Sequence, residues 1–140
     1  MKEELRRRIS ACQEAIESFC VEFKKWLGDQ VTPRDAFAGE LLLREALVNA
    51  VEHGCQRNRL AQVECVVRGG PGRLLIAVLD PGHGFDCRSR WDPNPDLFAC
   101  SGRGVLIFRT YASRVRFNRA GNAVMLYRRL EKKNRKEMRD

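Results

Sequence analysis

The ten residues EALVNAVEHG, at positions 45–54, decide the fold of this chain. They close a predicted helix over residues 33–53 that is apolar on nearly every side, as a buried helix is. Glu45, Asn49 and His53 nevertheless recur every four residues, so they share one face of that helix. A carboxylate and an amide are costly to bury without hydrogen-bonding partners. This polar face therefore either meets solvent or serves a ligand.

Two helices are expected before the first strand. Apolar residues recur at three- and four-residue spacing over residues 3–27, which predicts one amphipathic helix. Thr32 has the properties of an N-cap for the helix over 33–53. Pro33 suits the first helical position, and Asp35 comes three residues after the cap.

Short apolar runs after position 60 have the composition of strands. Two of them flank a glycine-rich turn at 69–72, which predicts an antiparallel hairpin. The expected runs are strands at 62–68 and 74–79, a helix at 105–112, and strands at 115–118 and 123–128. This order predicts an α+β two-layer sandwich, in which helices cover one face of a mostly antiparallel sheet.

Two glycine-rich segments have the composition of ligand-binding loops. The first, DPGHGF at 80–85, follows an apolar strand, so its carboxylate is placed to accept a hydrogen bond from a ligand amine. The second, SGRGV at 101–105, opens a helix, and the N–H groups at a helix N-terminus attract phosphate. A tight turn or a flexible loop is the alternative interpretation of each segment. Neither has the spacing of a P-loop or of a dinucleotide-binding fingerprint.

In this order, the three segments resemble the nucleotide site of the GHKL, or Bergerat-fold, ATPases. More closely, the chain resembles the anti-sigma-factor serine/threonine kinases of the RsbW/SpoIIAB type. The matches are residues 45–54 to their N box, 80–85 to their D-x-G-x-G-F box, 101–105 to their S-G-x-G box, and 121–126 to their last, G-T-x-V-x-L box. The resemblance covers about residues 10–128 and implies the histidine-kinase-like ATPase fold.

The resemblance also implies ATP and Mg²⁺ as cofactors and assigns roles to single residues. Glu45 is implied as the general base that takes the proton from a serine or threonine hydroxyl of a partner protein. Asn49 is implied to hold Mg²⁺ through its amide oxygen, and Asp80 to accept a hydrogen bond from the adenine amino group. Further nucleotide contacts are implied for His53, Gly82, Gly84, Phe85, Gly102, Arg103, Gly104, Val105 and Asn122.

The implied activity is that of an ATP-dependent serine/threonine protein kinase that binds a sigma factor and phosphorylates an antagonist with a STAS domain. A homodimer is left open. Three alternatives also stay open: an ATP-binding partner-switching module without significant kinase activity, a histidine-kinase catalytic domain, and a nucleic-acid binder suggested by the basic tail. The sequence has no recognition helix or aromatic platform, which speaks against nucleic acid.

The chain departs from the family pattern in three places. Asn122 replaces the usual threonine of the last box, and Cys100 stands where relatives can carry a basic residue. Relatives also begin with a strand, whereas the chain is here predicted to be helical from residue 3. The edge strand is then either lacking or supplied by another subunit.

Length and charge agree with a nucleotide-binding domain. The chain has 140 residues, with 26 Lys or Arg and 18 Asp or Glu, for a formal net charge of +8. Residues 1–87 carry 12 basic and 13 acidic side chains, whereas residues 88–140 carry 14 and 5. The excess therefore lies around the expected phosphate-binding loop and in the tail. We expect a single ATP-binding domain over 1–130 and a basic polar tail over 131–140.

The composition also bears on location. No run approaches the roughly 18 apolar residues that a membrane span needs, and residues 1–6 contain no apolar stretch typical of a secretory signal. We therefore expect a cytoplasmic protein without membrane attachment. The cysteines form no C-x-x-C pair and are expected to be free thiols. They are Cys12, Cys20, Cys55, Cys65, Cys87 and Cys100.

Overall fold

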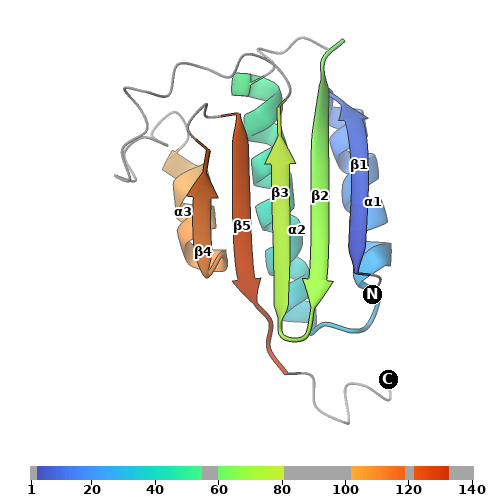
Figure 1. Cartoon of the computed structure of the whole chain (residues 1–140), viewed down its shortest axis with the longest axis vertical. Helices are drawn as coiled ribbons and strands as arrows, with labels where there is room; N and C mark the ends of the chain where they lie inside the picture. Colours follow the sequence, from blue (N-terminus) through green and yellow to red (C-terminus); the bar gives the residue numbers. More distant parts are fainter. Residues whose placement is uncertain (1–2, 55–59, 81–101, 119–121, 133–140) are drawn as a thin grey trace.

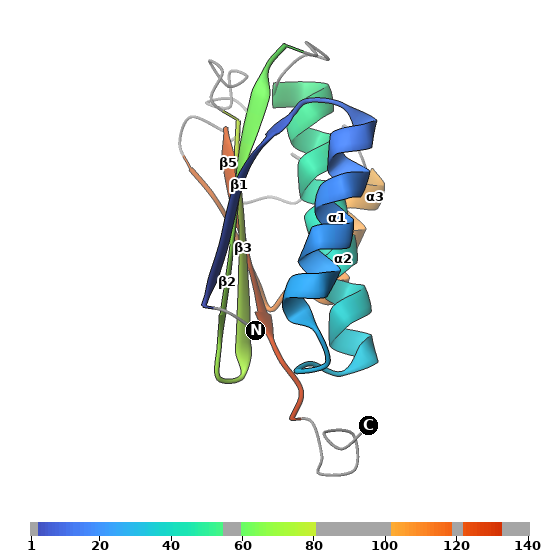
Figure 2. The same cartoon turned by 90° about the vertical axis from the view of Figure 1, so that its right-hand side faces the viewer.

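The computed structural model describes residues 3–54, 60–80, 102–118 and 122–132. They form two layers, a five-stranded sheet and helices that cover one of its faces (Figures 1 and 2). In chain order the elements are β1 (Glu4–Ser10), α1 (Gln13–Leu27), α2 (Pro33–Asn49), the π-helical turn η1 (Ala50–Gly54), β2 (Gln62–Gly70), β3 (Arg73–Leu79), α3 (Gly102–Tyr111), β4 (Arg114–Phe117) and β5 (Ala123–Arg129). The predicted α+β two-layer sandwich is confirmed.

The sheet has the strand order β1-β2-β3-β5-β4, and every neighbouring pair is antiparallel. The predicted hairpin forms between β2 and β3, where Gly70 pairs with Arg73 across the turn. Gly72 in this turn has a φ of 73°, a backbone conformation that favours glycine. β3 is the middle strand, so the residue that follows it, Asp80, emerges at the centre of one end of the sheet.

The N-terminal segment differs from the sequence-based expectation. Residues 4–10 form strand β1, which pairs with β2, and the helix begins only at Gln13. The prediction was wrong because Leu5 and Ile9 are four residues apart, a spacing that fits one face of a helix and also one face of a strand. Arg7 lies between them, and its guanidinium is 2.6 Å from the Glu22 carboxylate on α1. The edge strand that was expected to be lacking is therefore part of this chain.

The second helix begins as predicted but ends differently. The Thr32 hydroxyl accepts a hydrogen bond from the Asp35 N–H at 3.1 Å, which confirms the N-cap. The α-helical part stops at Asn49 and continues as the π-helical turn η1. α3 begins at Gly102, three residues earlier than predicted. Glycine is unfavourable inside a helix, so a prediction from helix propensity starts α3 after Gly104. In the first turn the N–H groups have no intrahelical partner, and glycine is tolerated there.

The hydrophobic core lies between the sheet and the helices. Gly39 on α2 shows how closely the two layers approach each other. A Cβ atom at this position would lie 3.1 Å from Leu74 Cδ2 on β3 and 3.2 Å from the Phe23 ring on α1. This close approach fixes α2 against the middle strand, and with it the residues at the end of α2. The largest fully buried side chains of the core include Phe19, Ile16, Leu42, Leu47 and Ile76.

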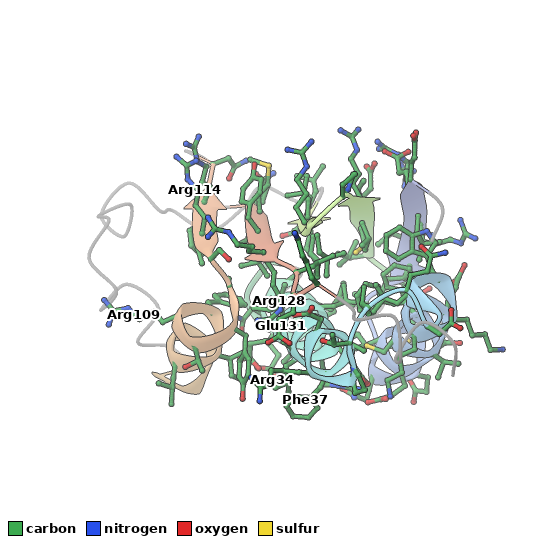
Figure 3. The ribbon with its side chains drawn as sticks, turned by 90° about the horizontal axis from the view of Figure 1, so that it is seen from below. Arg34, Phe37, Arg109, Arg114, Arg128 and Glu131 are labelled. Atoms are coloured by element: carbon green, nitrogen blue, oxygen red, sulfur yellow. The ribbon has the colours of Figure 1, made fainter. Side chains whose placement is uncertain are left out.

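A buried ion pair joins the sheet to the helices at the end of the molecule where α2 begins. Asp35, which is fully buried, accepts hydrogen bonds from Arg128 Nε at 3.0 Å and from the Glu131 N–H at 2.7 Å. Arg128 also donates to the Tyr111 carbonyl oxygen at 2.6 Å. Figure 3, seen from this end, shows Arg128 and Glu131 between the sheet and the helices. The start of α2, the end of α3 and the end of β5 are therefore tied together.

Three of the six cysteines lie in the described part of the chain, and all three are free thiols. Cys20 and Cys65 are buried in the core, whereas Cys12 is half-buried. Burial raises the pKa of the Cys20 thiol to about 11 and also raises the pKa of Cys65. The other three, Cys55, Cys87 and Cys100, lie outside the described residues. Within the described ranges, none of the helices has the length and apolar character needed to cross a membrane.

Candidate nucleotide site

Four elements bring those sequence-predicted site residues that the structure describes to one end of the molecule. The C-terminal end of α2, the end of β3 and the starts of α3 and β5 all lie at the upper end in Figure 1. α2 packs against α3, β3 and β5, so these ends are held in one rigid arrangement. The opposite end is the one closed by the buried Asp35–Arg128 pair.

Glu45 and Asn49 lie one turn apart near the end of α2. Glu45 is buried, with 9% of its surface exposed, and Asn49 is half-buried. The alternative that the polar face of this helix meets solvent is therefore wrong for Glu45. A largely buried carboxylate is a candidate general base where a substrate hydroxyl comes within hydrogen-bonding reach of it.

The π-helical turn η1 starts directly after Asn49. The N–H of Ala50 still donates to the carbonyl oxygens of Ala46 and Leu47, so the helix continues without a break. Single π turns inside helices often occur at functional sites. His53 belongs to this turn by its backbone, and its side chain lies outside the described part of the structure.

Asp80 is the first residue after β3 and is almost fully buried, with 2% of its surface exposed. Its N–H donates a hydrogen bond of 2.7 Å to the Asn122 carbonyl oxygen, just before β5 begins. This bond extends the β3–β5 pairing, in which Leu79 is opposite Ala123. The carboxylate is therefore held on ordered backbone, which is what a selective hydrogen-bonding site requires.

The side chain of Asn122 forms a hydrogen-bonded pair with that of Asn118. Its Oδ1 accepts a hydrogen bond of 2.5 Å from the side-chain amide of Asn118, so this amide is engaged in the turn between β4 and β5. Asn118 Oδ1 in turn accepts from the N–H groups of Asn122 at 3.0 Å and Ala123 at 3.1 Å. The two asparagines fix the turn that positions Asp80. Sequence analysis missed Asn118, although an asparagine at the end of a strand before a glycine-containing turn is a typical turn residue.

The N-terminus of α3 brings the S-G-x-G segment to the same end. Gly102 and Gly104 lie in the first turn of this helix, and Gly104 is buried. The N–H groups in the first turn of a helix, together with the helix dipole, are suited to phosphate. The side chains of Arg103 and Val105 lie outside what the structure describes, as do Gly82, Gly84 and Phe85.

The described residues also indicate what kind of metal this end could hold. Among them, no three His, Cys, Asp or Glu side chains gather into a metal cage. Mg²⁺ is commonly held by one or two protein oxygens together with the phosphates of a nucleotide. Asn49, which is half-buried and one helical turn after the buried Glu45, has the amide oxygen that such a site needs. The residues present therefore fit a metal that arrives with its nucleotide.

The fold and this arrangement define the class of protein. Residues 9–128 match the family described as the histidine kinase-like ATPase domain. The match covers most of the chain, so the chain belongs to this family and is a GHKL-type ATPase domain. Membership implies ATP binding and, in general terms, ATPase or phosphotransferase chemistry. No curated protein matches the chain.

Proposed function

We propose that this chain is an ATP-dependent serine/threonine protein kinase of the RsbW/SpoIIAB type, which acts as an anti-sigma factor. The observation that carries the proposal is the buried Glu45 one turn before Asn49, at the end of the molecule where Asp80 and the start of α3 also lie. A domain that only binds ATP has little need of a buried carboxylate at this position. A kinase needs it to accept the hydroxyl proton of its substrate.

Each residue has one task in the proposed transfer. Asp80 accepts a hydrogen bond from the adenine amino group, and the N-terminus of α3 lies toward the phosphates. Asn49 would hold Mg²⁺, which would neutralise part of the negative charge of the phosphates. The hydroxyl oxygen of the substrate then bonds to the γ-phosphorus, its proton passes to Glu45, and the bond from the γ-phosphorus to the β,γ-bridging oxygen breaks to release ADP.

The proposed partners are a sigma factor and an antagonist with a STAS domain, which carries the serine or threonine to be phosphorylated. We infer these partners from the resemblance of the four sequence boxes to this class of kinases. The test is incubation of the full chain with Mg-ATP and STAS-domain proteins from the same genome, followed by mass spectrometry for phosphoserine and phosphothreonine. We expect one phosphorylated site on one such protein.

A matched pair of variants makes the test specific. Glu45→Gln is expected to lower the transfer rate by about 10²- to 10⁴-fold, the usual contribution of a general base, with ATP binding retained. Glu52→Gln removes a carboxylate that is exposed on the neighbouring η1 turn and should leave the rate unchanged. ATP binding without transfer to any such protein would instead indicate a nucleotide-gated partner-switching module. A chain that fails to bind ATP would overturn both.

A further inference from the structure

The face of the sheet that the helices leave uncovered has a regular distribution of side chains. On β2, β3 and β5 the residues that point away from the helices alternate with the buried ones. In the centre they are mainly apolar: Val66, Leu75, Ala77, Leu79, Met125 and Tyr127. The Tyr127 hydroxyl lies 3.9 Å from Met125 Sδ, which shows that these two side chains share the face.

Arginines surround this apolar centre. The strand register places Arg6 on β1 and Arg116 on β4 at the two ends of one row, with Val66, Ala77 and Met125 between them. Figure 3 shows Arg114 on the side of the sheet away from the helices. Among the described strand residues, this face has no lysine and the arginines Arg6, Arg8, Arg68, Arg73, Arg114, Arg116 and Arg129.

The acidic residues on this face neutralise only part of its charge. Glu64 lies 2.7 Å from Arg6, and Glu4 lies 2.8 Å from Arg68. Five arginines make no ion pair with any described residue: Arg8, Arg73, Arg114, Arg116 and Arg129. Two of them, Arg73 and Arg129, are directly opposite each other on β3 and β5. Like charges in directly opposed positions destabilise a sheet, so this pair is costly unless an anion lies against it.

We infer that the uncovered face of the sheet is a docking surface for an acidic amphipathic helix of a partner protein. An apolar centre that includes a Met and a Tyr, with a charged rim rich in Arg, resembles the composition of a protein–protein interface. Five strands at their usual spacing are about 19 Å wide, and a helix with its side chains is about 10–12 Å across. A helix with an apolar stripe therefore covers the centre, and glutamates on both sides of the stripe meet the arginines.

The same charges argue against other occupants. Two copies of this face would bring two sets of unpaired arginines together, so a dimer through it is unfavourable. Tyr127 is the only aromatic residue among those that point outward from the described strands, which makes the face a poor stacking platform for single-stranded nucleic acid. This inference is independent of the proposed kinase activity, because the face lies on the opposite side of the sheet from the helices that carry Glu45 and Asn49.

The probe for this inference is a synthetic 18-residue helical peptide with a leucine stripe flanked by glutamates. The reference peptide has glutamine in place of each glutamate. We expect the glutamate peptide to bind the full chain at least tenfold more tightly and to slow amide hydrogen exchange on the edge strands β1 and β4. Equal binding of the two peptides, or protection confined to the helices, would overturn the inference. Tighter binding of oligouridine or of phosphatidylserine vesicles at this face would overturn it as well.

Charge-reversal variants complete the test. Arg73→Glu and Arg116→Glu should each weaken peptide binding by at least threefold. Lys25→Glu and Arg109→Glu, which reverse exposed charges on α1 and α3, should not. Arg73→Glu also turns the opposed pair with Arg129 into an ion pair, so its unfolding midpoint should rise rather than fall. A loss of binding together with a gain in stability cannot be attributed to misfolding.

Discussion

Asp80 and Asn122 are joined by a backbone hydrogen bond of 2.7 Å, donated by the N–H of Asp80 to the carbonyl oxygen of Asn122. The bond couples the end of the middle strand β3 to the turn before β5. It places a nearly fully buried carboxylate on rigid backbone, at the end of the molecule where α2 and α3 also present their site residues. The proposed nucleotide site is therefore built on the end of the sheet.

Replacement of this carboxylate should weaken nucleotide binding. A hydrogen bond to a charged acceptor contributes about 1.5–3 kcal/mol, compared with about 0.5–1.5 kcal/mol for a neutral one. Asp80→Asn is therefore expected to raise the Kd for ATP by about tenfold, as measured by isothermal titration calorimetry. Asp29→Asn removes an exposed carboxylate at the other end and should leave the Kd unchanged. An unchanged Kd for Asp80→Asn would argue against its contact with adenine.

Asn118 should matter for stability and for ATP binding alike. Asn118→Ala removes the acceptor of two N–H groups in the turn between β4 and β5; because both hydrogen bonds are exposed, the loss of unfolding free energy should be about 0.5–1.5 kcal/mol. The same variant should raise the Kd for ATP, because the turn positions Asp80. Asn118→Asp keeps the oxygen that accepts from the two N–H groups but loses the donor to Asn122 Oδ1, so in urea titrations it separates the two contributions. A stability loss without any change in ATP binding would separate the turn from the site.

Breaking the buried pair of Asp35 and Arg128 should lower the stability of the fold. Arg128→Met leaves the Asp35 carboxylate buried without its ion-pair partner, so we expect a loss of about 3–5 kcal/mol in urea unfolding. Asp35→Leu combined with Arg128→Met should recover much of this loss, because a buried pair is often replaced by apolar residues at little cost. A single variant as stable as the unmodified chain would contradict the burial of the pair.

The buried thiols should be unreactive in the folded chain. Burial raises the pKa of Cys20 to about 11, from an ordinary value of 9.0, so at pH 8 it is almost entirely protonated. Alkylation with iodoacetamide and peptide mapping should show Cys12 reacting before Cys20 and Cys65, and this difference should disappear on unfolding. Because Cys20 holds its proton more tightly when folded, this contribution to stability is complete below about pH 9 and declines as the pH rises toward 11. Rapid alkylation of Cys20 in the native chain would contradict its burial.

The sequence predicted most of the fold from composition, turn residues and helix caps. β2 and β3 are apolar runs on either side of a glycine-rich turn, and α2 starts with Thr32 and Pro33 as a cap and first residue. β1 was missed because Leu5 and Ile9 fit the period of a helix and also that of a strand. Only the pairing with β2, which is distant in sequence, decides between them.

Part of the candidate site was predictable because it lies in short sequence motifs, whereas the rest depends on contacts that no motif marks. Short motifs mark Glu45, Asn49 and Asp80, and the fold brings their elements to one end. Asn118 was missed, because its role depends on two backbone N–H groups across a turn rather than on a motif. The Asp35–Arg128 pair was also missed, since its partners are 93 residues apart.

Calorimetric titration of the full chain with Mg-ATP and with Mg-GTP tests the nucleotide site most directly. Adenine presents an amino group where guanine presents a carbonyl oxygen, and the buried Asp80 carboxylate can accept a hydrogen bond only from the former. We expect ATP to bind and GTP to bind at least about 100-fold more weakly, since a site built around a buried polar group rejects an analogue that leaves it unpaired. Equal affinity for the two nucleotides, or no binding of ATP, would contradict an adenine site at Asp80.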